Sequence, residues 1–555
     1  MCSETDGPSM RTPVVIVGGG PVGLALALFL DAQQVACVVC DEGDFSFEHP
    51  RGNTHNARTM EHYRRLGIAD RVRTLGLPDT YPTDVAYFTR YSGFELARLP
   101  MASSVEKRKN VTAAQRVDQV LEPLHRANQM YVERFLARYA RTRPNITLRH
   151  GCRVDRIAPD ADGVTIRDSD GGQWRTQYVV GCDGGHSLVR HSAGIIYSGQ
   201  RLLDQDILGR RATAAYLRLP TLRRELLGGR EAWSYWAVNA QVVVNLISLD
   251  GADEYSLLTS SVDPDSFDAQ QLTQIVRQAA GTDLPVEVLG HRAWTPGAAL
   301  VAESFGEGRV FLAGDAAHLF TPTGGFGMNT GIDDVANLAW KLAARIHGWG
   351  GTRLLDTYGA ERRPVALRNT AAARALNQNL GDIERPDTLE EDSPAGRAAR
   401  ETVGARLSAL GEQFASIGVQ LGARYDGSPL ISEDGEAPPA DSLTTYTPSG
   451  VPGGRAPHLW LDERREAGSS LFDLFGPGFT LLRLGGSPPA AEALRASAAG
   501  RGIPLTVLDI PDPAARDLYG RDLVLVRPDQ HLAWRSNRAP HDADALLGRL
   551  TGASS

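Results

Sequence analysis

A cluster of glycines near the start of the chain has the spacing of a phosphate-binding turn. Gly18, Gly20 and Gly23 follow the apolar run "VVIV" and lead into a second apolar run, "LALALFL". The first glycine permits a tight turn, the second lets the backbone approach a pyrophosphate, and the third allows a helix and a strand to pack closely. The helix expected to begin near Val22, directly after Pro21, directs its N-terminus at the phosphates. The chemistry that this pattern indicates is dinucleotide binding.

An acidic residue in the expected position strengthens this interpretation. Asp41 stands 23 positions after Gly18, at the end of the next expected strand, where a carboxylate can accept a hydrogen bond from a ribose hydroxyl. Glu42 is the adjacent alternative. The fingerprint fits NAD and FAD equally, so the choice between them depends on residues further along the chain.

The elements that position these residues follow from hydrophobic periodicity. We expect a strand over 14–17, a helix over about 22–33 and a strand over 36–40, so the two strands are parallel and joined by a right-handed crossover. A further helix is expected over 129–142, and the alternating residues 146–184 indicate hairpins.

Length, charge and cysteine content limit the remaining possibilities. A chain of 555 residues predicts two or three domains, and a net charge of −8 without a polybasic tail argues against nucleic-acid binding. No apolar stretch is long enough for a membrane span and no signal-peptide pattern is present, which favours the cytoplasm. Cys37 and Cys40 fall within one expected strand and point to opposite faces, so we predict buried thiols and no metal site.

Three blocks of sequence together resemble one family. They are the glycine turn, "YVVGCDGGHSLVR" at 178–190, and "GRVFLAGDAAHLFTPTGGFGMNTGIDDVANLAWKLA" at 308–343. In order and spacing they resemble the FAD-dependent aromatic hydroxylases, the group A flavoprotein monooxygenases related to para-hydroxybenzoate hydroxylase and phenol hydroxylase. The resemblance covers roughly residues 12–380.

The third block also has a physical interpretation of its own. A strand delivers Asp315, whose carboxylate can accept a hydrogen bond from a ribityl hydroxyl of FAD, and a glycine-rich loop then precedes a long helix. Backbone amides at such a helix N-terminus favour negative charge. The resemblance places Pro322 and Gly325 beside the isoalloxazine ring, and Met328 and Asn329 at its pyrimidine edge.

The resemblance implies further flavin contacts outside the third block. Asp183 is expected to contact both FAD and NAD(P)H, and Arg51 is expected to bind FAD while Arg58 orients a helix. Gln129, at the start of an expected helix, is expected to be a further flavin contact, and Gln119 is the alternative residue for this role. His318, three residues after Asp315, is expected to be part of a structural turn.

The expected fold class is α/β: a Rossmann-like FAD-binding domain with an inserted substrate domain rich in β-sheet, and a C-terminal thioredoxin-like α/β domain. The C-terminal unit resembles the tail of phenol hydroxylases and contains no cysteine, so it has no thioredoxin redox chemistry. The expected bounds are 12–80, 116–200 and 296–385 for the discontinuous FAD-binding domain, 81–115 and 201–295 for the substrate domain, 386–440 for a helical linker and 441–555 for the C-terminal domain.

The reaction implied by the resemblance is a monooxygenation. FAD would be reduced by NADPH or NADH bound transiently, and O2 would then form a flavin C4a-hydroperoxide that hydroxylates a phenolic or polycyclic aromatic substrate. In the aromatic segment "EAWSYWAVNAQVVVNL", Trp233 and Tyr235 alternate on a strand and are expected to bind the substrate, with Tyr235 as the catalytic contact to a phenol.

Two alternatives remain open at this point. The same scaffold could carry out Baeyer–Villiger insertion or epoxidation, or it could bind flavin and sequester an aromatic intermediate without oxygenating it. The expected partners are a small aromatic substrate, O2 and NAD(P)H, with no nucleic acid or membrane, and the C-terminal unit is a possible contact for a homodimer.

Overall fold

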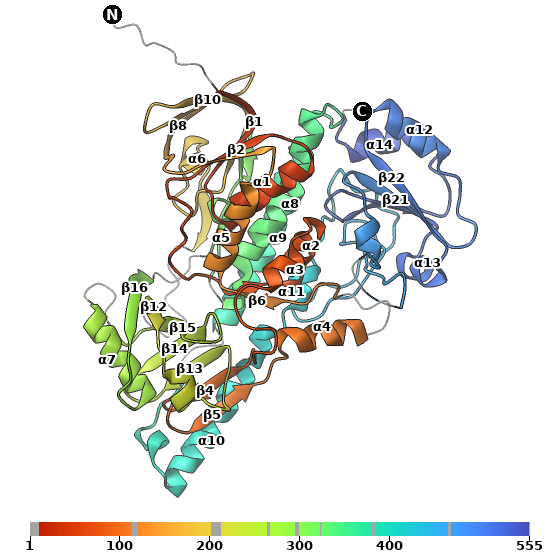
Figure 1. Ribbon diagram of the computed structural model, residues 1–555. Coiled ribbons are helices and arrows are strands. Elements are labelled where there is room, and N and C mark those ends of the chain that lie inside the picture. Colours follow the sequence, from red (N-terminus) through yellow and green to blue (C-terminus); the bar gives the residue numbers. More distant parts are fainter. Residues whose placement is uncertain are drawn as a thin grey trace, which may run out of the picture.

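Figure 1 shows the computed structural model, in which three units meet along the long helices α8 and α9. The residues it describes are 10–553, apart from 114–119, 201–211, 263–266, 295–298, 322, 379–382, 464 and 466–467. Pro322 and the rival glutamine Gln119 therefore lie outside the described residues.

A parallel sheet forms the centre of the first unit. Its parallel strands lie in the order β19-β10-β1-β2-β7 and run over Val310–Leu312, Gln173–Gly181, Met10–Val17, Cys37–Cys40 and Ile146–Arg149. Val14, Val15 and Ile16 of β1 are fully inaccessible to solvent, as expected for a strand covered on both faces. The predicted parallel strand–helix–strand opening is confirmed.

Helices and hairpins complete this unit. Helices α1 (Pro21–Ala32), α5 (Gln129–Ala140) and α8 (Phe326–Ile346) pack together and share the core of the sheet. The expected hairpins form through β8 (Val154–Pro159) and β9 (Val164–Asp168): β9 pairs antiparallel with β8 on one side and with β10 on the other. The shorter helices of the first unit are α2 (Ala57–Arg65), α3 (Ala69–Arg73) and α6 (Leu188–Ser192), and its second long helix is α9 (Thr357–Gln378). Two small sheets pair β3 (Thr54–His55) with β6 (His125–Arg126), and β17 (Ala299–Ala302) with β11 (Tyr197–Gln200) and β20 (His318–Leu319).

The second unit is a seven-stranded sheet covered on one face by a helix. Its order is β16-β12-β15-β14-β13-β4-β5, over Glu287–Trp294, Ala212–Arg218, Glu254–Thr259, Val243–Ser248, Ser234–Val238, Val85–Phe88 and Glu95–Leu99. Helix α7 (Ala269–Ala280) lies on one face, with Leu272 and Val276 buried against the strands. Helix α10 (Pro394–Ala409) packs on β5, whereas helix α4 (Ser104–Ala113) lies between this sheet and the C-terminal unit (Figure 1). The opposite face of the sheet is turned toward the first unit.

The C-terminal unit is a small α/β domain. Its four strands lie in the order β22-β21-β23-β24, and β22 and β21 are parallel. The strands run over Leu505–Ile510, Phe479–Leu484, Leu523–Val526 and Leu532–Ser536, and the helices over Glu492–Gly500 (α12), Pro513–Tyr519 (α13) and Ala543–Leu550 (α14). The α/β class with an inserted β-rich sheet is confirmed, whereas the exact domain bounds stay a prediction.

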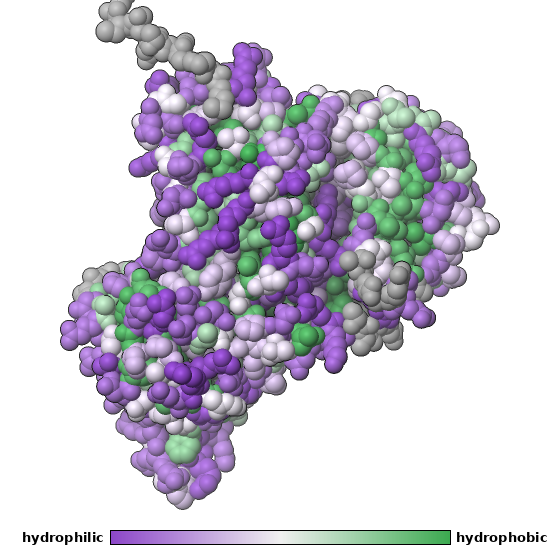
Figure 2. All heavy atoms as spheres, viewed as in Figure 1, coloured by the Kyte–Doolittle hydropathy of each residue, from purple (hydrophilic) through white to green (hydrophobic). Residues whose placement is uncertain are grey.

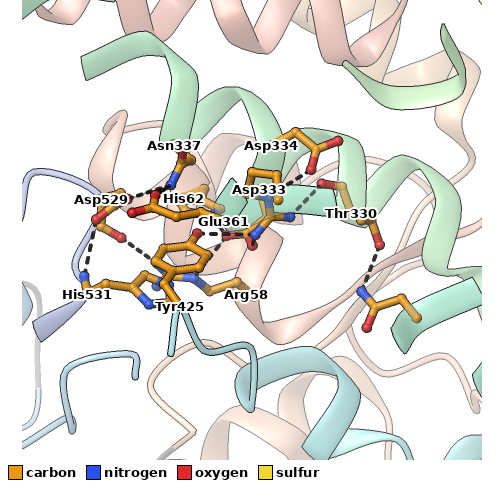
Figure 3. Close-up of polar contacts among 12 residues, drawn as sticks. Arg58, His62, Thr330, Asp333, Asp334, Asn337, Glu361, Tyr425, Asp529 and His531 are labelled. Carbon is orange, nitrogen blue, oxygen red and sulfur yellow. Dashed lines mark hydrogen bonds and ion pairs between the residues drawn. The ribbon is translucent and has the colours of Figure 1, made fainter. Parts of the chain in front are cut away.

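Buried ion pairs join the C-terminal unit to the long helices of the first. Glu361 on α9 accepts hydrogen bonds from Lys341 Nζ at 2.6 Å and Asn337 Nδ2 at 2.7 Å, both on α8, and from Arg527 Nη1 at 2.7 Å. Arg527 also donates to Asp529 at 2.6 Å. Figure 3 shows Glu361, Asn337 and Asp529 within this cluster. The helix that begins at the glycine-rich loop is thus fixed by charges at its other end.

The same network continues toward the loop. Arg362 donates to Asp334 Oδ1 at 2.8 Å and to Asp333 Oδ2 at 2.5 Å, and His62 contacts Asp333 at 2.8 Å (Figure 3). His318 contacts Asp334 Oδ2 at 2.6 Å and is fully buried. This contact fits the structural role expected for His318.

The visible outer surface is largely hydrophilic, with hydrophobic residues gathered over the C-terminal unit (Figure 2). Leu505 and Val507 of the edge strand β22 are partly exposed there. Within the described ranges, we find no helix with the length and apolarity that a membrane crossing needs.

Candidate active site

The carboxyl ends of four adjacent parallel strands bring the predicted cofactor residues together. Val17 is in register with Cys40 on one side and with Gly181 on the other, and Gly181 pairs with Leu312. Gly18, Asp41, Asp183 and Asp315 follow these four strand ends by one to three positions and line a single cavity. Ligands of open parallel sheets bind at this edge.

The glycine turn has the geometry that its sequence predicts. Gly18 adopts φ +101°, and a Cβ there would lie 2.3 Å from the carbonyl oxygen of Cys182. A Cβ on Gly23 would lie 2.0 Å from the carbonyl oxygen of Gly18. A Cβ on Gly20 would instead point into open space, and Gly20 caps α1 without any side-chain hydrogen bond. The helix N-terminus, with Pro21 and Val22, therefore faces the cavity with unpartnered amides, which suits a phosphate.

The acidic residues around this turn differ in their environments. Asp41 accepts hydrogen bonds from the amides of Gly19 at 2.6 Å and Gly43 at 2.8 Å, so it holds the turn in shape while lining the cavity. Glu42 beside it is exposed at the cavity wall. Asp183 Oδ1 is buried without a partner, and burial raises the pKa of this carboxyl. An orphaned buried acceptor in the cavity fits a ligand that donates hydrogen bonds, such as the ribose and ribityl hydroxyls of FAD.

Asp315 lines the same cavity. The surrounding protein raises the pKa of its carboxyl by desolvation, an effect that His318 and Arg51 partly offset. Asp315 is accessible from the cavity, where a hydroxyl donor could reach it.

The loop before α8 presents bare backbone to the same cavity. Gly324 and Gly325 have φ values of +82° and +66°, and α8 begins without a side-chain cap. Gly325 and Met328 line the cavity. Asn329 does not, because its amide donates to the carbonyl oxygens of Thr54 at 2.9 Å and Gly325 at 2.6 Å. Asn329 thus fixes the loop that shapes the site.

Arg51, in the loop between β2 and β3, and Gln129, the first residue of α5, both line the cavity. Arg51 is exposed at its rim, whereas Gln129 is buried and donates to Glu133 Oε1 at 2.7 Å. Arg58 lies away from the cavity and donates to Glu61 at 3.0 Å and to the carbonyl oxygen of Asp529 at 2.8 Å. This placement agrees with the expectation that Arg58 orients a helix.

The second wall of the cavity is the face of the seven-stranded sheet opposite α7. Its residues come from neighbouring strands in register: Trp236 pairs with Tyr87 and Asn245, and Asn245 pairs with Leu258. The rings of Trp236 and Tyr87 stack with centroids 6.0 Å apart. The whole cavity measures about 1670 Å³. Pockets for one drug-sized ligand measure roughly 300–1,000 Å³, so this cavity has room for a dinucleotide together with a second ligand.

Tyr235 is not part of this wall. Its ring is fully buried on the α7 side of the sheet, and its hydroxyl contacts that of Tyr81 at 2.9 Å and accepts from the amide of Ala232 at 2.7 Å. Trp233 and Tyr235 were expected to share one face of a strand, but they do not. Strand β13 begins at Ser234, so Trp233 precedes the strand and its side chain does not follow the alternation of the strand residues. Trp233 lines the cavity, whereas this structure does not bring Tyr235 to a substrate.

Arg126 is a cavity residue that the sequence analysis missed. Its guanidinium lies over the Trp233 ring, 3.8 Å from the centroid, and donates to Thr54 Oγ1. Desolvation lowers the pKa of Arg126 to about 9, which leaves the side chain charged at neutral pH. No motif could have marked it, because Trp233 approaches it from a distant part of the chain.

These features define a flavin-nucleotide site that faces an aromatic pocket, and the comparisons agree. The family described as "FAD binding domain" matches residues 11–373, and the family described as "Aromatic-ring hydroxylase, C-terminal" matches residues 449–554. This chain belongs to the FAD-dependent aromatic-ring hydroxylase family of monooxygenases, and its cofactor is FAD.

Individual relatives align over nearly the whole chain. FAD-dependent monooxygenase apdD of Emericella nidulans is 31% identical over 97% of this chain and 90% of its own. Phenol 2-monooxygenase of Pseudomonas sp. is 29% identical over 98% and 96%. The solved structure of the rebeccamycin biosynthetic enzyme RebC with reduced flavin is 36% identical over 99% and 100%, with a TM-score of 0.86.

Proposed function

We propose that this protein uses NAD(P)H and O2 to hydroxylate a phenolic or polycyclic aromatic substrate. One observation carries the proposal: a glycine turn at one strand end, acids at three neighbouring strand ends and an aromatic sheet face line the same cavity. The activities named for apdD and phenol 2-monooxygenase support it.

The FAD would lie along the carboxyl edge of the parallel sheet. The α1 N-terminus at Gly20 would hold the pyrophosphate, Asp41 a ribose hydroxyl and Asp315 a ribityl hydroxyl. The loop at Gly325 and Met328 would lie beside the flavin ring, where the amides of α8 favour negative charge. The other residues proposed to contact or shape the FAD site are Gly18, Pro21, Val22, Gly23, Glu42, Arg51, Gln129, Asp183, Pro322 and Asn329.

When bound, FAD supplies the redox and oxygen chemistry. The chain's own contribution is to bind the aromatic ring, orient it and exclude water. Trp233 and Trp236 offer planar apolar surface for a ring, and Asn245 offers a polar contact beside them.

Product analysis with isotopically labelled O2 tests this proposal. The purified, FAD-loaded protein is mixed with NADPH or NADH and a panel of phenols, aromatic acids and quinoid polyketides. A ring hydroxyl that carries one labelled oxygen, with stoichiometric oxidation of the nicotinamide, is the expected result. A product with an inserted ester oxygen would indicate Baeyer–Villiger insertion, and an epoxide product would indicate epoxidation. Either product would contradict hydroxylation. Ligand-dependent flavin spectra without any oxygen transfer would contradict the proposed activity and favour sequestration.

A further inference from the structure

Arg126 combines deep burial with an incomplete set of partners. The residue is only 7% exposed, and that exposed part lines the cavity. Its Nη1 donates to Thr54 Oγ1, whereas its Nε has no hydrogen-bond partner among the described residues. Among the residues that the structure describes, no carboxylate forms an ion pair with it.

Buried arginines elsewhere in the chain show what satisfies such a group. Arg362 is paired with Asp333 and Asp334, and Arg527 with Glu361 and Asp529. A buried charge without a counterion is costly, and it persists where a function requires it. Arg126 is therefore poised to receive an anionic group from a ligand.

The surroundings of Arg126 add positive charge. Lys107 on α4 donates to Thr83 Oγ1 at 3.1 Å, and its pKa falls to about 7 through burial and repulsion by Arg126 and Arg73. Arg73 itself is neutralised by Glu122, to which it donates at 2.6 Å. With Arg73 paired and Lys107 only partly charged near neutral pH, Arg126 holds the uncompensated charge that an anion would relieve.

The contact with Trp233 indicates which kind of anion fits. The guanidinium covers the indole face, and its Nη2 makes no hydrogen bond to a residue that the structure describes. Trp233 lines the cavity together with Trp236, on the wall to which we assign the aromatic ring. A planar guanidinium edge suits a carboxylate, which it can bind through two parallel hydrogen bonds.

We propose that Arg126 is the receptor for a carboxylate on the aromatic substrate, so that the enzyme selects aromatic acids over uncharged analogues. This inference rests on the proposed function, because it uses the same cavity. The alternative is that Arg126 binds the flavin. It donates to Thr54, and the Thr54 side chain borders Gly325, which we place beside the flavin ring.

The test is a binding titration that needs no turnover. The FAD-loaded protein is titrated with 3-hydroxy-2-naphthoic acid and with its amide, 3-hydroxy-2-naphthamide, and Kd is read from the flavin absorbance. The wild type should bind the acid about ten- to hundred-fold more tightly than the amide, as a charge-assisted contact implies. Arg126→Gln should abolish this preference and Arg126→Lys should retain part of it. Lys107→Gln is the matched control, because it removes a nearby half-buried cation that does not line the cavity, and it should keep the preference.

Three results would overturn the inference: equal Kd values for acid and amide in the wild type, an unchanged preference in Arg126→Gln, or an equal loss in Lys107→Gln, which would show a general field effect. Loss of bound FAD in Arg126→Gln, with the preference for the acid intact after reloading, would assign the residue to the flavin. Flavin content and thermal unfolding report whether each variant is folded. Because binding is measured separately, an acid preference without oxygenation would contradict only the proposed function, and oxygenation without the preference would contradict only this inference.

Discussion

Glu361→Gln should destabilise the protein far more than its small change in shape implies. The carboxylate is fully buried and receives hydrogen bonds from Lys341, Asn337, Ser428 and Arg527 at 2.6 to 2.8 Å. A neutral amide leaves Lys341 without its ion-pair partner. Breaking a buried ion pair from one side costs roughly 3–5 kcal/mol, and we expect a loss of that size in the free energy of unfolding.

The same side chain predicts an acid-sensitive step. Although burial alone raises it, the pKa of Glu361 is held well below its usual range by Arg527 and Lys341. A carboxyl with a lowered folded-state pKa stabilises the fold above its unfolded pKa, near 4.5, and loses that contribution as the pH falls further. The wild type should therefore lose stability below about pH 4.5, and Glu361→Gln should show a shallower loss.

Urea unfolding followed by tryptophan fluorescence measures both effects. Trp340 donates to Asp529 Oδ2 at 3.2 Å within the same network, so it reports on this region. Glu390→Gln is the matched control, because Glu390 is a half-exposed partner of Arg90, and it should cost about 1 kcal/mol or less. The double variant Lys341→Met with Glu361→Gln should recover part of the loss. A cost below about 1 kcal/mol for Glu361→Gln, or an unchanged acid slope, would refute the reasoning.

Three further substitutions test the site. Gly18→Ala would place a Cβ 2.3 Å from the Cys182 carbonyl oxygen, so FAD affinity should fall by about tenfold or more; tight flavin retention would contradict this. Asp315→Ala should lower the ratio of flavin to protein after gel filtration, by an affinity loss of about tenfold or more, and a fully flavinylated, active variant would remove its role. Tyr235→Phe should leave the substrate KM unchanged while lowering stability by about 1–3 kcal/mol, because it loses its contacts to Tyr81 and the Ala232 amide; a raised KM without loss of stability would restore Tyr235 to the substrate site.

The sequence alone could predict the parts of the site that depend on local order. Gly18, Asp41 and Asp315 each follow a short apolar strand, and parallel strands align their carboxyl ends, so these residues were expected to meet. Tyr235 shows the limit, because its face depends on where β13 begins, and alternation counted from Trp233 gives the wrong side. Arg126 could not be predicted at all.

Arg126 was missed for a physical reason. Its proposed role rests on an Nε without a hydrogen-bond partner among the described residues and on a ring supplied by a distant segment, and neither leaves a local pattern. The ion pairs between α8, α9 and the C-terminal unit could not be predicted either, because charged residues at these positions are equally typical of a solvent-exposed helix face.

The path of the chain through the second sheet limits how pockets can be exchanged between relatives. Strand β4 enters this sheet from a segment that precedes α5, and it pairs in parallel with β13, which arrives well over a hundred residues later. A chimera that transplanted only the longer stretch would set a foreign β13 beside a native β4, with mismatched rings at Tyr87 and Trp236. Recombination, in evolution or in the laboratory, therefore has to move both segments together for a new specificity to arrive in a folded protein.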